Sequence, residues 1–194
     1  SRGTRDRRKK IEDFADRLRE RFKEVEIGWS LMGVHRIRFR HEGRPARVTL
    51  PAEGEMTLRL EEKISPKFPC VIKTRGRFEW PWAWVGLRPL DRIKIFDPLL
   101  DESVLIYTTA VFGGYLRELA LQEIARDGGA KGIAESLIVL RKTPGIRKFR
   151  LSMSESTGFQ VRFTMRTEDL YFRPDALEAA VHHVLKLYDA LVMY

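Results

Sequence analysis

The sequence feature that most constrains the fold is a set of short runs in which apolar and polar side chains alternate. Residues 35–40, 46–50 and 56–60 each follow this pattern. A period of two residues is typical of a β-strand that has one buried face and one solvated face. The sequence Glu-Gly-Arg-Pro at 42–45 has the composition of a turn between the first two runs. The sequence therefore predicts an antiparallel meander that ends near residue 60.

A second hairpin and several amphipathic helices complete the pattern. Residues 149–153 and 159–165 alternate on either side of a turn. Apolar residues recur at three- and four-residue steps elsewhere, which predicts helices over 9–25, 112–126, 133–140 and 174–191. The strands arrive as hairpins and not as repeated βαβ units. This order favours an α+β fold in which amphipathic helices pack on one face of an antiparallel sheet.

The domain organisation follows from length and composition. A chain of 194 residues, 43% hydrophobic and 32% charged, is large enough to bury a core of its own. We expect residues 1–8 to be a disordered basic lead-in. Residues 9–194 should then form a single α+β domain, with room for two sub-lobes that meet near residues 85–100. No window reaches the roughly 18 consecutive apolar residues of a membrane span. Because the chain begins with Ser1, we expect a segment to precede it.

The charge is concentrated at the N-terminal end. The chain carries a formal net charge of +9, and residues 1–50 hold 15 Lys and Arg against 8 Asp and Glu. A basic end attracts the phosphates of nucleic acid or of anionic lipid. It also matches the basic flank found on the cytoplasmic side of a membrane helix.

An aromatic segment, comprising Phe78, Trp80, Trp82 and Trp84, is the strongest candidate for a binding surface. Aromatic residues between prolines in a loop suit a protein interface or a membrane interface. Arg75 and Arg77 precede the segment and would suit anionic headgroups. The structural alternative is that the tryptophans plug the edge of the sheet. We expect at least one of the three to be core and one or two to be partly exposed.

Two strand faces rich in basic residues form an alternative binding site for phosphate. Arg36, Arg38, Arg40 and Arg47 share one side of the first hairpin, and Lys148, Arg150, Arg162 and Arg166 share one side of the second. Glu55 and Glu61 on the neighbouring run are expected to neutralise part of this charge. The faces also lack interleaved aromatic residues for stacking on bases. A solvated strand face explains the same pattern without any ligand.

No stretch carries a catalytic motif. The four histidines are scattered along the chain, and the adjacent His182 and His183 point about 100° apart on a helix, so we expect no metal site. The single cysteine, Cys70, excludes an internal disulfide and is expected to be an inert, partly buried thiol. We expect no cofactor.

The chain resembles a bacterial family of unknown function whose members carry one or two membrane helices followed by a cytosolic α+β domain. The matching features are the basic run at 7–10, the His-Glu-Gly-Arg-Pro-Ala-Arg-Val sequence at 41–48, the Ile-Phe-Asp-Pro sequence at 95–98, and the terminal helix. The aromatic segment departs from that pattern. The resemblance implies a domain on the cytoplasmic side of a membrane, and it carries over no catalytic residue.

These features together predict a non-enzymatic binding or scaffolding domain at the cytoplasmic face of a membrane. Its partner would be a protein or an anionic lipid, bound through the aromatic segment and a basic face. The first alternative is a nucleic-acid-binding domain that uses the arginine-rich strand faces. The second is an enzyme whose site is assembled from residues distant in the sequence.

Overall fold

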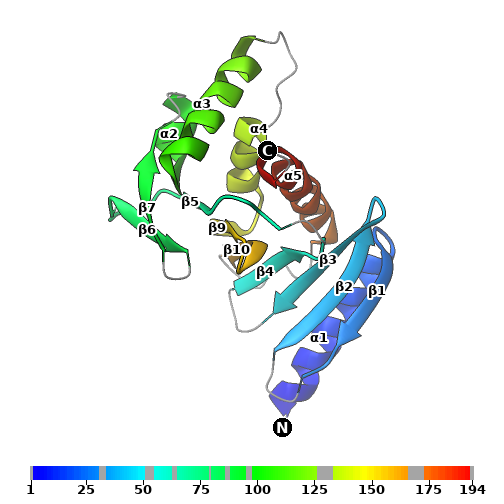
Figure 1. The fold of residues 1–194 in the computed structure, drawn as a ribbon. Coiled ribbons are helices and arrows are strands. Elements are labelled where there is room, and N and C mark those ends of the chain that lie inside the picture. Colours follow the sequence, from blue (N-terminus) through cyan, green and yellow to red (C-terminus); the bar gives the residue numbers. More distant parts are fainter. Residues whose placement is uncertain are drawn as a thin grey trace.

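Over the residues that it describes, the computed structural model shows one ten-stranded sheet covered by helices (Figure 1). It describes residues 2–30, 34–50, 55–62, 65–78, 80–85, 88–94, 98–125, 133–165 and 173–192. The strand order is β1-β2-β3-β4-β10-β9-β5-β8-β7-β6, and every neighbouring pair is antiparallel. The α+β prediction is therefore confirmed.

The strands are β1 (Lys23–Gly28), β2 (His35–His41), β3 (Arg44–Leu50), β4 (Glu55–Leu60), β5 (Cys70–Thr74), β6 (Trp82–Val85), β7 (Arg88–Ile93), β8 (Val104–Thr108), β9 (Ile146–Ser154) and β10 (Gly158–Met165). The helices are α1 (Arg2–Arg19), α2 (Pro98–Ser103), α3 (Ala110–Ala125), α4 (Ile133–Lys142) and α5 (Pro174–Val192). The predicted meander is β2-β3-β4, and the predicted second hairpin is β9-β10.

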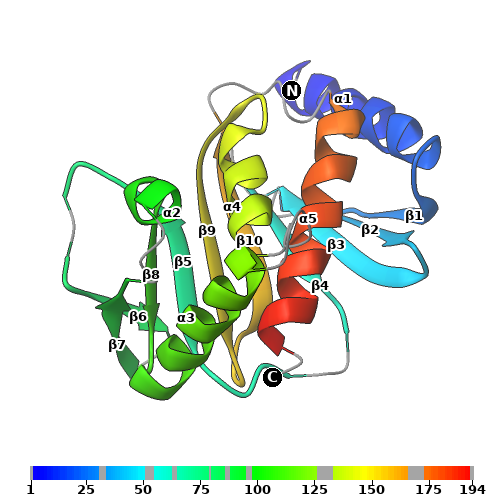
Figure 2. The ribbon, with the colours of Figure 1, turned by 90° about the horizontal axis from the view of Figure 1, so that it is seen from above.

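The helices pack on one face of the sheet, as Figure 2 shows for α3, α4 and α5. The apolar positions of each alternating run point toward them and form the main core, in which Ile37, Leu58 and Val161 are fully buried. A close approach fixes α3 on β7, because a Cβ added at Gly113 would lie 3.1 Å from atoms of Ile93. The glycine near the start of this helix therefore permits close packing against the sheet.

The opposite face of the sheet, called here the open face, has a smaller core at one end. The β6-β7 hairpin contributes Ala83, Val85 and Leu90 to this second core, and the strands beside it contribute Val71, Leu105 and Tyr107. Along β6 the exposed and buried residues alternate. One side of this edge strand therefore packs on the sheet and the other side faces solvent.

Two predicted boundaries at the N-terminal end differ from the structure. Helix α1 begins at Arg2, so the described part of the expected disordered lead-in is helical. The helix ends at Arg19 and not near Val25, which lies in β1, the strand that pairs with β2. The step from Phe22 to Val25 fits a helical period, whereas the step from Val25 to Ile27 fits a strand, and the sheet pairing decides between them. The short helix α2 was not predicted.

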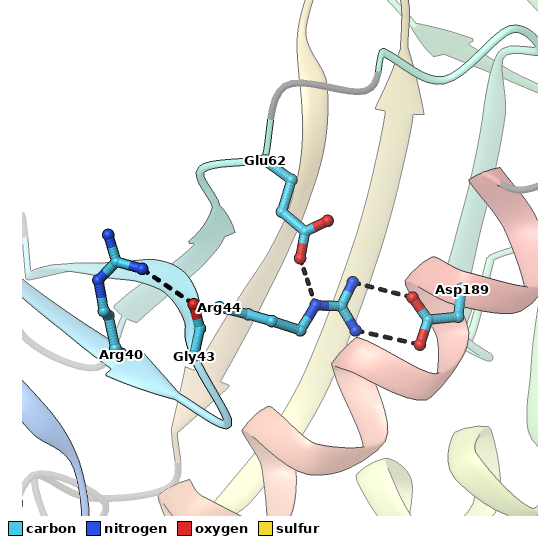
Figure 3. Close-up of polar contacts among 5 residues, drawn as sticks. All are labelled: Arg40, Gly43, Arg44, Glu62 and Asp189. Atoms are coloured by element: carbon cyan, nitrogen blue, oxygen red, sulfur yellow. Dashed lines mark hydrogen bonds and ion pairs between the residues drawn. The ribbon is translucent and has the colours of Figure 1, made fainter.

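The turn between β2 and β3 is clamped to α5 by Arg44 (Figure 3). Its guanidinium nitrogens donate to the Asp189 carboxylate at 2.8 and 3.0 Å, and its Nε donates to Glu62. These hydrogen bonds raise the pKa of Arg44 above its ordinary value, although partial burial opposes the shift. The clamp joins segments that are far apart in the sequence and sets the position of the meander against the last helix.

Replacing Arg44 by alanine is expected to lower the free energy of unfolding by about 1–2 kcal/mol, because a half-buried bidentate pair is worth more than an exposed one. Urea unfolding measures the change. Arg40→Ala is the matched control, since Arg40 pairs with Glu24 at 2.7 Å in an exposed position. The control should lose less than about 0.5 kcal/mol. Equal losses in the two variants would contradict a special role for Arg44.

Candidate functional site: a cationic groove beside exposed aromatic residues

The two predicted basic strand faces lie on the same side of one sheet. The β2-β3-β4 meander joins the β9-β10 hairpin through the pairing of β4 with β10. Residues that pair in register from strand to strand therefore form one row across the open face, called here the register row. It runs through Arg36, Thr49, Thr57, Arg162, Arg150 and Lys73. The sequence shows the two faces separately, and only the strand order brings them together.

The middle of the open face contains a groove of about 980 Å³, called here the cationic groove. Strands β5, β9 and β10 form its floor, and the residues after β5 form one wall. Among the described residues that line it are seven basic side chains, namely Lys73, Arg75, Arg77, Arg147, Lys148, Arg150 and Arg162. The acidic residue in this lining is Glu55, and Phe78 from the aromatic segment also lines the groove. Residues from both predicted binding sets therefore meet here.

Arg150 lines the groove and pairs in register with Arg162 on one side and Lys73 on the other. Burial lowers its pKa, the guanidinium of Arg162 lowers it further, and Tyr107 acts in the opposite direction. Arginine stays charged despite such shifts, so they mark an electrostatic cost of holding two guanidinium groups together. An anion bound between them would relieve that cost. Within the described residues, no carboxylate lies at ion-pair distance from Arg77, Lys148 or Arg162.

Most of the predicted basic residues on the meander, unlike Arg77, Lys148 and Arg162 in the groove, lie close to carboxylates. Glu61 accepts from Arg47 at 3.0 Å and lies 3.7 Å from Arg38, while Arg40 pairs with Glu24. The neutralisation predicted for Glu61 is thus confirmed, and Glu55 lies in the groove. Arg36 stands at the far end of the register row. Arg166 lies outside the described residues.

All four aromatic side chains of the aromatic segment are exposed, with accessible fractions of 87% for Phe78, 63% for Trp80, 44% for Trp82 and 54% for Trp84. The prediction that at least one tryptophan is core is wrong. Trp82 and Trp84 take the outward positions of β6, and the inward ones belong to Ala83 and Val85.

Although its side chains are exposed, the backbone of the aromatic segment is held against the open face. The Tyr107 hydroxyl donates to the Trp80 carbonyl at 2.8 Å, and Arg150 Nη2 donates to the Trp84 carbonyl at 3.1 Å. Trp80 and Trp82 also contact each other, with ring centroids 5.7 Å apart. The segment is therefore an anchored apolar surface next to the cationic groove. Arg150 links the two, because it lines the groove and donates to the segment.

Two basic residues of the groove, Lys73 and Arg147, were not predicted from the sequence. Lys73 and Arg147 gave no signal because their neighbours in space come from other strands. Lys73 pairs in register with Arg150, which requires β5 to lie beside β9. A sequence alone does not specify this order, since β5 and β9 are more than seventy residues apart.

The histidines are less scattered than the sequence indicates. His41 and His182 come together with Glu42 where the β2-β3 turn meets α5, and their potential ligand atoms lie within 4.8 Å of one another. The side chain of His41 is only 11% exposed, although the residue directly precedes a turn. This cluster lies apart from the cationic groove, whose lining includes none of the three residues.

Comparison with known proteins gives one distant structural likeness. No protein-family model and no characterised protein sequence matches the chain. A similar solved structure is the crystal structure of the mycobacterial trehalose monomycolate transport factor A, TtfA. It has a TM-score of 0.48 and 11% sequence identity over 94% of this chain and 93% of that chain. This is a distant relationship of fold, and the membrane-anchored family resemblance stays a prediction.

A helix that crosses a membrane needs about 20 largely apolar residues. Within the described ranges, no helix combines the length and the apolar character that a membrane-spanning helix needs. The longest described helices, α1 and α5, both have one polar side.

Proposed function

We propose that this domain binds a phosphate-bearing membrane surface through the cationic groove and the aromatic segment. The observation that carries the proposal is the position of seven basic side chains next to four exposed aromatic side chains, with Glu55 the acid in the described lining of the groove. Neither feature alone distinguishes a binding surface from a solvated one. Their combination matches the chemistry of the membrane interface, where basic residues meet headgroup phosphates and tryptophans lie at headgroup level.

The groove suits phosphate groups in particular. Guanidinium groups bind phosphate oxygens through two parallel hydrogen bonds, and Arg150 and Arg162 are directly opposite each other on neighbouring strands. Burial and, to a smaller degree, the guanidinium of Arg162 lower the pKa of Arg150, and a bound phosphate would offset both effects. Lys148 on the floor and Arg77 on the wall add charge without a described carboxylate partner.

The aromatic segment supplies the apolar part of the contact. Exposed aromatic clusters of this kind are uncommon on surfaces that contact only water. Because the backbone is held by Tyr107 and Arg150, little ordering of the segment is required on binding. A protein partner with an acidic and apolar surface would meet the same chemistry. Binding to vesicles that contain no protein therefore separates lipid from a protein partner.

Nucleic acid is the second candidate, and a specific observation favours it. The register row from Arg36 to Lys73 crosses most of the sheet, and the structure supplies the aromatic residues that the strand faces lack in sequence. Single strands bind to such combinations of basic groove and aromatic platform. The pairing of Arg38 and Arg47 with Glu61 weakens this candidate, because it neutralises the meander half of the face.

The double variant Lys148→Ser/Arg162→Ser is expected to bind anionic vesicles roughly 25-fold more weakly than the unaltered protein. Each basic residue near an anionic surface contributes about 1 kcal/mol, and 1.4 kcal/mol is a factor of ten. Co-sedimentation with phosphatidylcholine vesicles, with and without phosphatidylserine, measures the change at about 0.05 and 0.2 M salt. A blue shift of the tryptophan fluorescence on binding should report entry of the aromatic segment into the interface.

The matched control is Arg38→Ser/Arg40→Ser, which removes the same charge from the same face outside the groove. It should keep most of the vesicle binding. Equal losses in the two double variants would contradict a specific groove. Tight, salt-dependent binding of single-stranded DNA without binding to either vesicle would overturn the membrane proposal in favour of nucleic acid.

A further inference from the structure

We propose that His41, Glu42 and His182 form a binding site for a divalent transition-metal ion, with Zn²⁺ as the expected ion. The three side chains come from the end of β2, the following turn and the middle of α5. Two imidazole nitrogens and one carboxylate oxygen are a donor set that zinc uses in proteins, with a fourth position open to water.

The two distances that involve the carboxylate are close to those of a metal site, and all three donor atoms lie within 4.8 Å of one another, so binding an ion would also draw the two rings closer together. Glu42 Oε1 lies 3.8 Å from His41 Nε2 and 3.8 Å from His182 Nδ1. Metal–ligand bonds of about 2.0–2.2 Å in tetrahedral geometry place donor atoms about 3.4 Å apart. A shift of roughly half an ångström brings the carboxylate into range of both rings. The Glu42 and His182 side chains are 63% and 42% exposed, so they have room to move.

His41 provides an independent observation. Its Nε2 atom is buried and has no hydrogen-bond partner among the described residues, and it faces the Glu42 carboxylate. A buried polar atom without a partner costs free energy, and a bound cation would satisfy it. The ring itself is held by an edge contact to Phe22 and another to His182, with centroids 5.4 and 6.4 Å away.

The turn that carries Glu42 is also held in a fixed position relative to α5. Glu42 has a φ of +52°, an uncommon conformation for a residue other than glycine. Arg44, two residues further along, is clamped to Asp189 on α5. The turn is therefore fixed relative to the helix that carries His182. A metal ion at this position would add a second link between the same two segments.

The test is a zinc titration of the full chain without an affinity tag, after treatment with a chelator. Calorimetry should give one Zn²⁺ per chain, and thermal unfolding should shift upward with zinc because the ion binds the folded state. Glu42→Gln and His182→Gln change exposed side chains and should keep the fold. Each is expected to weaken zinc binding by about tenfold or more.

His35→Gln is the control, because His35 lies at the other end of β2, about 20 Å from His41 at the strand rise. It should leave zinc binding unchanged. Absence of zinc binding would overturn the proposal. The same holds if zinc binding survives both Glu42→Gln and His182→Gln, or if His35→Gln weakens it equally, since adventitious histidine binding would then be the explanation.

Discussion

Replacing Phe163 by alanine should lower the free energy of unfolding by about 3–5 kcal/mol, the usual cost of removing a buried aromatic side chain. Phe163 is fully buried in β10, at the centre of the sheet. It pairs in register with Phe149 on one side and Met56 on the other, and all three belong to the main core. The cavity would therefore open beneath the helices, where packing is dense. Urea unfolding with a fixed slope measures the loss.

Phe78→Ala is the matched control, since the same atoms are removed from a side chain that is 87% exposed. We expect a change within about 0.5 kcal/mol. A loss comparable to that of Phe163→Ala would mean that Phe78 is buried in solution. The exposed aromatic segment, and with it the proposed membrane contact, would then be wrong.

The Cys70 thiol should be almost unreactive in the folded protein. Burial raises its pKa to about 12 from 9.0, with a hydrogen bond involving Thr108 acting in the opposite direction. At pH 8 this shift lowers the thiolate fraction about a thousandfold, and the thiolate is the reactive form. Ellman's reagent should therefore label one thiol per chain in denaturant and none on the same timescale in buffer. Equal rates in the two conditions would contradict the burial of Cys70.

The same shift predicts a pH dependence of stability. The protonated thiol is favoured in the folded state, so its contribution is complete below about pH 9 and is lost as the pH rises toward 12. Cys70→Ala should remove this part of the alkaline loss while lowering stability at neutral pH. Unfolding curves at pH 8 and pH 10 for both proteins measure the difference. An unchanged alkaline slope in the variant would assign the loss to other groups.

The local pattern of the sequence was sufficient to predict most of the fold. The alternation in the meander and in the second hairpin is strong because one face of each strand is buried under helices and the other is solvated. Helix α5 was predicted for the same reason, since its buried residues include Leu177, Val181 and Val184. The errors are at junctions such as Phe22 to Val25, where the spacing of apolar residues fits a helix before the junction and a strand after it.

The candidate site was only partly predictable, because it depends on strand order. Arg150 and Arg162 were assigned to one basic face, and Arg75 and Arg77 to the aromatic segment, with no indication that they share a groove. The neighbours of Lys73 are set by the insertion of β5 between β9 and β8. Tryptophan exposure was mispredicted because Ala83, Val85 and Leu90 fill the second core, where larger side chains were expected.

The two ends of the sheet bear on how the protein behaves at high concentration. An antiparallel sheet that does not close presents unpaired backbone groups at its edges, which can recruit strands from other molecules. The β1 edge carries Lys23, Glu24 and Glu26 and has a register shift, and the β6 edge is only four residues long and follows Pro81. Charge, irregularity and shortness are the features that discourage strand addition. Self-association of this domain would therefore have to proceed through side-chain surfaces and not through continuation of the sheet.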